Sequence, residues 1–348
     1  LSGNSAFNNT QNGFVLSASI SNVFTNNSAY FNQDGFRLVL ASNSNTFFNI
    51  SAYNNSNAGF NLNSSEGTVI NQSMVFSNTN YGVYTENITS AGTKLENSSI
   101  YSNGYGIYLD RTNYTAIVNS SVYNNTNDNG QIYLVSALFN NFSSSTVLGN
   151  DALNYGISSD ANSLQNRFTN VNISRFDVAG YNLNGTASSA ATAAIFNVGT
   201  LFNLGTAFDK PVGGGFANLS NLTIYNVKNG INFTTAANYV SLLNNVLYNC
   251  SSTDSGAYGA CVNLNYGSSE SNAVITGNNI SNTSGNAFRL SLQSSSFASN
   301  IIDNATIALN ITNYNLTFSG NNIINNTPAT GYEIYITGGA NLPTGAYN

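Results

Sequence analysis

Apolar and polar residues alternate over short stretches along most of the chain. One phrase recurs, in which glycine is followed by an apolar residue, any residue and a second apolar residue. It occupies residues 13–16, 35–38, 59–62, 82–85 and 106–109, slips by one residue at 130–134, and returns in looser form at 230–233, 261–264, 287–290 and 333–336. Alternation over so few positions predicts short, half-buried β-strands, and helical periodicity is absent almost everywhere.

A second alternating phrase precedes the first within each unit, as at residues 71–78, 97–103 and 119–124. Through the first half of the chain one unit follows another after about 22–26 residues, a period typical of solenoids. We therefore predict an all-β fold, a right-handed single-stranded parallel β-helix of about a dozen coils of roughly 22–26 residues each. A leucine-rich repeat does not fit, because its units would carry more leucine and a helix.

Stacked coils place equivalent side chains on top of one another, because each strand pairs with its counterpart about 4.8 Å away in the next coil. One predicted inward column comprises Phe14, Phe36, Phe60, Val83, Ile107 and Ile132. A predicted ladder of stacked amides comprises Asn54, Asn78, Asn103 and Asn124. Asparagine suits such positions because it tolerates a left-handed backbone at turns, and its amide can hydrogen-bond to the next amide in the stack.

The repeat is interrupted most clearly between residues 184 and 215, which lack the phrase and are rich in alanine, glycine and threonine. We interpret this segment as an insertion or enlarged loop between coils. The predicted organisation is therefore β-helix coils over residues 1–183, the insertion over 184–215, and coils continuing the same solenoid over 216–348. The chain opens partway into a unit, which predicts a processed or trimmed N-terminus.

The composition narrows the range of functions. Charged residues make up 6% of the 348 residues, the net charge is −6 and there is no histidine. Eight scattered lysines and arginines cannot form the basic stripe that nucleic-acid binding needs. No apolar run is long enough to predict a transmembrane segment. An apolar content of 41% nevertheless favours an ordered chain over a disordered one.

Two features predict an extracellular or cell-surface location. Cys250 and Cys261 are close in sequence, and we expect a disulfide between them, with two buried thiols as the alternative. About two dozen Asn-x-Ser/Thr sequons are present, many of them by chance. The turn after the glycine phrase varies in length and is expected to be the outward loop. We expect N-linked glycans on the sequons that fall there, Asn63, Asn87, Asn113 and Asn141.

Asn124, by contrast, is expected to stay unmodified, because it belongs to the predicted amide ladder.

Other side chains should point outward in columns. If Ile107 and Leu109 point inward, Tyr108 points out, and Tyr84 and Tyr133 should stack beside it on neighbouring coils. A second outward column is predicted at Phe76, Tyr101 and Tyr123. Such aromatic strips bind sugar rings, pack against another protein, or stabilise the sheet by stacking on themselves.

The stretch Gly106-Ile107-Tyr108-Leu109, followed by Asn119-Ser120-Ser121-Val122-Tyr123-Asn124-Asn125, resembles the parallel β-helix repeat of NosD-like periplasmic proteins, polysaccharide lyases, pectinases and phage tailspikes. The resemblance covers most of the chain outside residues 184–215. It implies the fold and leaves the activity open, because enzymes, adhesins and structural proteins share that repeat.

No catalytic, cofactor-binding or metal-binding constellation emerges from the sequence. The Gly-His-Gly element of pectinase-like hydrolases is missing, because the chain has no histidine. Asp128, Asp151 and Asp160 come from successive coils. If they converged on one edge, they would form a weak Ca²⁺ site or a carboxylate pair for glycoside chemistry. The adjacent charges Asp110–Arg111 and Asp209–Lys210, and the pair Arg175 and Asp177, are interpreted as solvated turn charges.

The leading hypothesis is a non-enzymatic extracellular structural protein, a glycosylated subunit of a surface filament, sheath or S-layer-like assembly. Its main partner would be further copies of itself, packed through the strip Tyr84, Tyr108 and Tyr133 into a homopolymer. The low-charge, asparagine-rich composition resembles that of archaeal surface proteins. One alternative is a carbohydrate-binding adhesin or tailspike-like fibre that uses the same strip for glycans. The other is a polysaccharide lyase or glycoside hydrolase.

Overall fold

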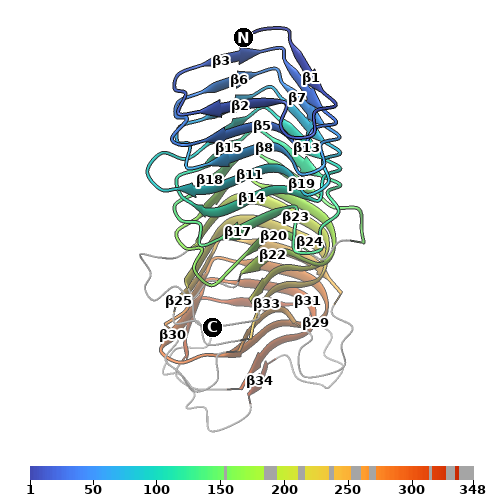
Figure 1. The fold of residues 1–348 in the computed structure, drawn as a ribbon. Helices are drawn as coiled ribbons and strands as arrows, with labels where there is room; N and C mark the ends of the chain where they lie inside the picture. The colour runs from blue at the N-terminus through green and yellow to red at the C-terminus, as the bar shows by residue number, and fades with distance from the viewer. Residues whose placement is uncertain are drawn as a thin grey trace. The chain divides into compact units, whose positions relative to one another are not determined.

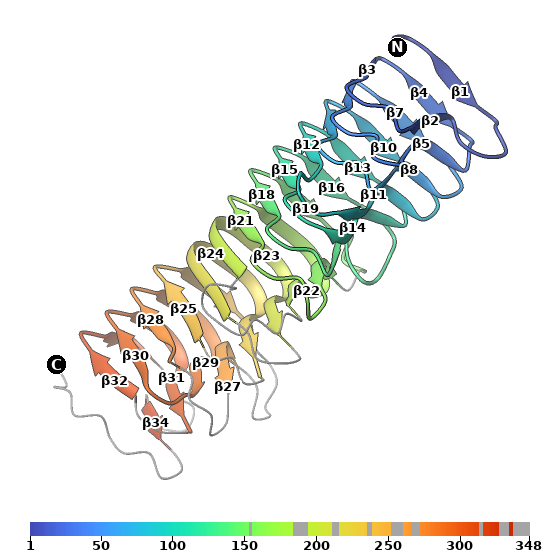
Figure 2. The same ribbon diagram turned by 60° about the vertical axis from the view of Figure 1, so that its left-hand side comes forward.

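The computed structural model is a parallel β-solenoid of about 12 coils, as predicted (Figures 1 and 2). It describes all residues except 153–154, 184–193, 211–215, 235–238, 252–259, 266–271, 313–315, 327–333 and 337–348. Within the described residues there is no helix, and hence none that could cross a membrane. The chain divides into two compact units, Leu1–Ile173 (unit 1) and Ser174–Asn348 (unit 2).

Unit 1 repeats a coil of three short strands, and equivalent strands form three sheet faces. The first face consists of β1 (Ser5–Phe7), β4 (Ser28–Tyr30), β7 (Ser51–Tyr53), β10 (Met74–Phe76), β13 (Ser99–Tyr101), β16 (Ser121–Tyr123) and β19 (Thr146–Leu148). The second consists of β2 (Phe14–Ser17), β5 (Asp34–Val39), β8 (Ala58–Asn63), β11 (Tyr81–Ile88), β14 (Tyr105–Thr112), β17 (Ile132–Val135) and β20 (Tyr155–Ser159). The third consists of β3 (Val23–Thr25), β6 (Thr46–Phe48), β9 (Val69–Asn71), β12 (Lys94–Glu96), β15 (Ala116–Val118), β18 (Asn141–Ser143) and β21 (Arg167–Thr169).

The register confirms the predicted inward column of the second face. Phe14 pairs with Phe36, Phe36 with Phe60, and the pairing continues through Val83, Ile107 and Ile132. Beyond the first coil these side chains are at most 2% exposed. The three phenylalanine rings stack at 4.9–5.0 Å between centroids. Burial of such side chains contributes about 1.5–3 kcal/mol each, so the column is a principal source of stability.

The glycine that opens the phrase is explained by close approach of the backbone. A Cβ atom on Gly59 would lie 2.4 Å from Cγ1 of Val75, and one on Gly82 would lie 2.5 Å from the carbonyl oxygen of Gly106. Both distances are too short for a real Cβ atom, so neither position can carry a side chain without a shift of its neighbours. The phrase therefore begins with glycine because neighbouring coils and faces meet there.

The predicted amide ladder exists, but two of its members were placed one residue too early. The buried ladder runs through Asn32, Asn55, Asn78, Asn103 and Asn125. Asn54 and Asn124 precede it, with left-handed backbones (φ 53° each) and exposed side chains. The corner residue takes the left-handed conformation and so turns the next residue inward. The prediction that Asn124 stays unmodified because it is a ladder member therefore loses its basis.

Each ladder asparagine makes three hydrogen bonds in the same pattern. The backbone N–H and Nδ2 of Asn103 both donate to Oδ1 of Asn125, at 2.9 and 3.0 Å. Nδ2 of Asn103 also donates to the carbonyl oxygen of Val75. The ladder ends at Gln131, whose Oε1 accepts both donors of Asn125 and whose Nε2 returns a bond to its carbonyl. The polar groups of this buried turn are thereby satisfied.

Unit 2 keeps the parallel pairing but has longer strands. Its strands are β22 (Asn172–Leu183), which begins in unit 1, β23 (Ala194–Lys210), β24 (Phe216–Phe233), β25 (Tyr239–Leu243), β26 (Val246–Cys250), β27 (Ala260–Asn265), β28 (Val274–Thr276), β29 (Asn279–Ser291), β30 (Ser295–Ala298), β31 (Ile301–Ile311), β32 (Leu316–Ser319), β33 (Asn322–Ile324) and β34 (Ile334–Ile336). β24 pairs in turn with β25, β26 and β27. One long strand therefore covers the positions that three separate strands occupy in the next coil.

The interpretation of residues 184–215 as an insertion needs correction in its middle part. Residues 194–210 form β23, which pairs in parallel and in register with β24. Phe196, Leu204 and Phe208 of this strand are buried as in any other coil. The alanine, glycine and threonine residues of this segment hide the alternation of apolar and polar positions in the sequence, but the strand forms nevertheless. Residues 184–193 and 211–215 lie outside the described residues, and the domain boundaries remain a prediction.

Candidate functional site: a tyrosine and carboxylate surface on unit 1

The predicted tyrosine strip lies on the outer side of the second face. Tyr84 pairs in register with Tyr108, and Tyr108 with Tyr133. Their strand neighbours Ile107 and Leu109 are buried, whereas all three tyrosines are half-buried. The alternation of the strand therefore turns these side chains outward, where a ligand could reach them.

Two further tyrosines, missed by the sequence reasoning, widen the strip into a cluster. Tyr81 and Tyr105 begin β11 and β14, immediately before the glycine of the phrase, and they are partners in the sheet. The Tyr81 ring stacks on that of Tyr84 at 4.9 Å, and the Tyr105 ring stacks on that of Tyr133 at 6.0 Å. The repeated pair Tyr-Gly is the sequence signal that could have revealed them. We call these five residues the tyrosine cluster.

Tyr108 is the centre of the tyrosine cluster. Its ring contacts the other four at centroid distances of 5.1–5.6 Å, and its plane is turned by 62–87° from each of theirs. Among the described residues no ring stacks parallel on Tyr108. The tyrosine cluster therefore differs from a regular column, in which each inner ring is covered on both sides.

Carboxylates border the tyrosine cluster at the ends of β11 and β14. Glu86 and Asp110 are partners in the sheet, and one guanidinium nitrogen of Arg111 contacts both, at 2.7 Å from Oε1 of Glu86 and 3.0 Å from Oδ2 of Asp110. Oε2 of Glu86 also accepts a hydrogen bond from Asn63 at 2.8 Å. Oδ1 of Asp110 is buried and has no hydrogen-bond partner among the described residues. The border thus combines oxygen acceptors with one shared cation.

The titration of these groups reflects their surroundings. Burial raises the pKa of Asp110 above its ordinary value; the guanidinium of Arg111 opposes that rise, and the charges of Glu86 and Asp160 add to it. Burial also raises the pKa of Tyr108 to about 12, helped by Asp110. The pKa of Tyr84 is raised for the same leading reason. All the phenols of the strip are accordingly neutral hydrogen-bond donors at neutral pH.

The three acidic residues considered for Ca²⁺ or glycoside chemistry have different surroundings. Asp160 is held in its own turn, where Oδ1 accepts the hydroxyl of Ser163 at 2.6 Å and the backbone N–H of Ser136 at 2.9 Å. Asp128 and Asp151 are exposed turn residues. Within the part of the chain that the structure describes, no three Cys, Asp or Glu side chains are grouped to hold a metal ion. Neither chemistry gains support.

The second predicted outward column lies on the first face and is built differently. Its rings are Phe7, Tyr30, Tyr53, Phe76, Tyr101 and Tyr123. Consecutive rings lie 4.9–5.0 Å apart and within 9° of parallel. The stack covers the faces of the inner rings and leaves their edges outward. A sugar needs a ring face, so this column is not a sugar platform.

The four sequons expected to carry glycans differ in accessibility. Asn87 and Asn141 are exposed, but Asn87 lies within β11 and Asn141 within β18, and neither is in the expected loop. Asn113 is half-buried, and its Oδ1 accepts the backbone N–H of Leu138. Asn63 is half-buried and already donates its Nδ2 to Glu86. Glycosylation of all four remains a prediction. Asn63 is the least suited to carry a glycan, because its Nδ2 is already engaged.

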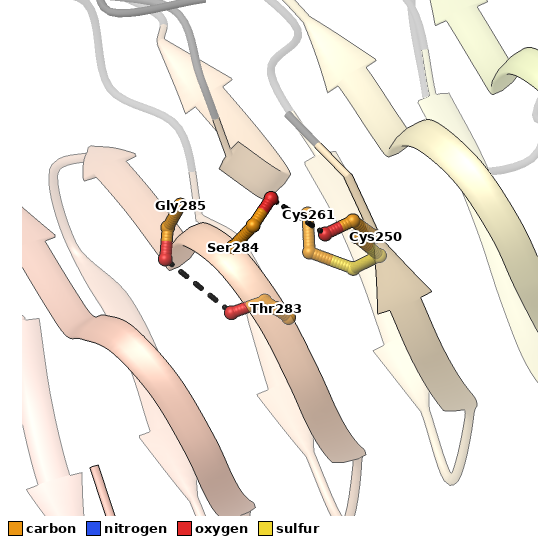
Figure 3. The surroundings of a disulfide bond; sticks show 5 residues. All are labelled: Cys250, Cys261, Thr283, Ser284 and Gly285. Carbon is orange, nitrogen blue, oxygen red and sulfur yellow. Dashed lines mark hydrogen bonds between the residues drawn. A yellow bond between two sulfur atoms is a disulfide. The ribbon is translucent and has the colours of Figure 1, made fainter. Parts of the chain in front are cut away.

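Unit 2 contains the predicted disulfide between Cys250 and Cys261, whose Cα atoms are 5.4 Å apart (Figure 3). Cys250 ends β26, Cys261 lies in β27, and both are buried. The hydroxyl of Ser284 in the following coil donates to the carbonyl oxygen of Cys250 (Figure 3). The bridge therefore closes the short segment between two consecutive strands of one coil.

Similarity to known proteins is confined to solved structures. No family model and no curated protein matches the chain. Among solved structures it aligns with the catalytic domain of a GH87 alpha-1,3-glucanase in complex with nigerose and with two single-residue variants of that domain. The identity is 10–11% and the TM-score 0.44–0.47. The alignments cover 96% of this chain but only 64% of those domains, and they establish nothing about activity.

Proposed function

We propose that the protein is a non-catalytic, extracellular β-helix that binds neutral polysaccharide through the tyrosine cluster. The observation that carries the proposal is Tyr108, a half-buried ring with no parallel neighbour, set among four other tyrosines and bordered by carboxylates. Pyranose rings have apolar faces that pack on aromatic rings, and their hydroxyls donate hydrogen bonds to carboxylates.

The charge around the tyrosine cluster favours a neutral ligand. Glu86 and Asp110 share a single cation, Arg111, and the charge of Asp160 acts on Asp110 as well, so the surface is locally acidic. Anionic polymers would be repelled, and so would a second copy that presented the same surface. A neutral polysaccharide meets no such repulsion and supplies many hydroxyl donors. Repulsion between copies thus disfavours the self-packing role that the sequence suggests for the strip Tyr84, Tyr108 and Tyr133.

The arrangement of the carboxylates favours binding over hydrolysis. A glycoside hydrolase needs one carboxylic acid and one carboxylate on either side of the scissile bond. Glu86 and Asp110 instead lie side by side on paired strands and contact the same guanidinium nitrogen of Arg111, so they do not stand on opposite sides of a substrate. An extracellular setting is supported by the disulfide Cys250–Cys261, because such bonds persist in oxidising compartments.

Affinity electrophoresis against a panel of neutral polysaccharides (mannan, xyloglucan, β-glucan and α-glucan) tests the proposal. We expect retardation by at least one polymer, an affinity at least tenfold lower in Tyr108→Ala, and near-normal affinity in Tyr108→Phe. The matched control is Tyr248→Ala, which removes a half-buried, stacked tyrosine of unit 2 and should bind normally.

Absence of binding to every polymer, or equal weakening in Tyr108→Ala and Tyr248→Ala, would contradict the proposal. Circular dichroism must confirm that each variant is folded before its binding is compared. Release of reducing ends from a bound polymer would replace binding by hydrolysis as the function. Loss of that release in Asp110→Asn would then locate the chemistry at the same surface.

A further inference from the structure

The first face of unit 1 carries a second regular column beside its aromatic one. At the outward position two residues before each ring stand Ser5, Ser28, Ser51, Met74, Ser99 and Ser121, and in the seventh strand Thr146 stands two residues before Leu148, which has no ring. Register pairs each of them with its equivalent in the next coil. The outer surface of this face is therefore two parallel rows, one mainly of hydroxyls and one of aromatic rings. We call it the serine–aromatic face.

The serine–aromatic face carries no charge. Its strands contain no Asp, Glu, Lys or Arg. The turn residues on one side are Asn26, Asn49, Gln72, Asn97, Asn119 and Ser144, and those on the other are Asn8, Phe31, Asn54, Ser77, Ser102 and Asn124. The second face, by contrast, bears Arg37, Glu86, Asp110 and Arg111. A face without charge can meet a copy of itself without repulsion in any register.

The serine–aromatic face is also held in place before anything binds. The five ring-to-ring stacks fix the aromatic row, and the strands beneath are buried at Ala29, Ala52 and Val75. The hydroxyls of the four serines at 28, 51, 99 and 121 have no hydrogen-bond partner within the described residues and remain free for an incoming surface. Tyrosine and serine lose little side-chain entropy on binding, so pre-ordered rows of them favour association.

We propose that the serine–aromatic face is the contact between two copies of this chain, related by a two-fold axis. Seven strands stacked at about 4.8 Å, each about 15 Å wide with its bordering turns, give about 500 Å² per copy, or about 1,000 Å² in all. That area is at the lower limit for a specific interface, and it corresponds to a weak, concentration-dependent dimer. Ring edges from one copy pack between the rings and hydroxyls of the other.

A second copy fits this surface better than the other occupants. The ring faces that a sugar needs are covered by stacking. A charged partner would find no complementary group. The dimer would leave the tyrosine cluster, which lies on a different face of each coil, available for polysaccharide. Pairing would thus make a bivalent binder, in which one chain's binding raises the effective concentration of the other's site.

Sedimentation velocity over a range of about 1–200 μM tests this inference, because a dissociation constant in that range corresponds to about 5–8 kcal/mol. We expect the wild-type protein to dimerise with rising concentration. The double variant Ser51→Glu with Ser99→Glu places like charges on the contact and should weaken dimerisation at least tenfold. The matched control, Thr46→Glu with Ala116→Glu on the third face, should dimerise as the wild type does.

A charge-complementation experiment guards against a variant that merely folds poorly. Mixing the Ser51→Glu, Ser99→Glu protein with a Ser51→Lys, Ser99→Lys protein should restore a dimer that neither forms alone. A monomer at every concentration, or a dimer unaffected by the glutamates, would overturn the inference. Binding of the glutamate variant to a short neutral oligosaccharide, which reaches only one site, separates this outcome from the proposed function, because its affinity per site should be unchanged.

Discussion

The outward position of the glycine phrase is filled differently in the two units. In unit 1 it carries Tyr84, Tyr108 and Tyr133, whose rings contact one another. In unit 2 the same position of the phrase carries Asn232 and Asn263. Nδ2 of Asn263 donates to Oδ1 of Asn232 at 2.9 Å, and Nδ2 of Asn232 donates to Asp209 at 3.0 Å. Three consecutive coils of unit 1 thus have an aromatic cluster where two consecutive coils of unit 2 have hydrogen-bonded amides; in the next coil of unit 2 the position carries Arg289.

The inward residues are nevertheless equivalent. Ile107 pairs with Ile132 in unit 1, and Ile231 pairs with Val262 in unit 2, all of them at most 1% exposed. The comparison shows that inward side chains and the backbone fix the register, while the outward column is free to vary. A function that resides in the outward column can therefore change from unit to unit without disturbing the fold.

The largest effect is expected from the buried amide ladders, which the two units share. Asn103 in unit 1 and Asn278 in unit 2 make the same three donated hydrogen bonds. Replacing either by alanine leaves buried donors and acceptors unpaired, so we expect each to lower the free energy of unfolding by about 3–5 kcal/mol. Chemical denaturation measures this cost.

The matched control is Asn54→Gly, at an exposed left-handed corner (φ 53°) where glycine is unstrained. It should change the free energy of unfolding by less than about 0.5 kcal/mol. If Asn103→Ala were mild and Asn278→Ala severe, the interior ladders would not be equivalent, and the comparison between the units would have to be redrawn.

The next effect distinguishes the units, because only unit 2 contains cysteine. The bridge joins residues 11 positions apart, and a loop of that length contributes about 3 kcal/mol in the chain-entropy description. Reduction should therefore speed amide hydrogen exchange in unit 2 peptides and leave the coils at the start of unit 1 protected, because each coil of a solenoid depends mainly on its neighbours. Equal loss of protection in both units would instead indicate a single cooperative unit.

A smaller effect is expected from the outward columns themselves. Tyr108→Asn removes four ring contacts from a half-exposed site and should lower the free energy of unfolding by about 1–2 kcal/mol. Asn232→Ala removes two hydrogen bonds and should cost about as much, since it deprives the buried Asn263 of its acceptor. Thermal denaturation of both variants compares the two solutions. A cost well above that of the interior Asn103→Ala would show that the outward column holds the register.

The smallest effect concerns pH and is confined to unit 1. Because the pKa of Asp110 is raised in the folded state, the folded protein keeps this proton after the unfolded chain has lost it. The contribution of Asp110 to the free energy of unfolding is therefore fully present at low pH. It declines as the pH rises from the ordinary pKa of the unfolded chain through the raised pKa of the folded protein. Urea denaturation across mildly acidic pH should show this decline in the wild type and less of it in Asp110→Asn. Parallel pH profiles for the two proteins would contradict it.

The candidate site was only partly predictable. The alternation of β14 implies that Tyr108 points outward and stacks near Tyr84 and Tyr133, and this follows from sequence alone. Tyr81 and Tyr105 were missed because they precede the glycine and lie outside the alternating phrase. The link between Glu86 and Arg111 joins residues 25 positions apart, and only the stacking of coils brings them together.

The sequence by itself determined the coil, its period and the inward columns, because a strand buried on one face needs apolar residues at every second position and glycine where coils meet. It did not determine which of two adjacent asparagines enters the ladder, as Asn54 and Asn55 illustrate, because the left-handed corner decides that. Nor did it reveal β23 within residues 194–210, where pairing with β24 overrides a weak pattern. Tertiary structure alone decided whether outward rings stack flat, as on the first face, or turn across one another around Tyr108, because ring orientation depends on neighbours one coil away.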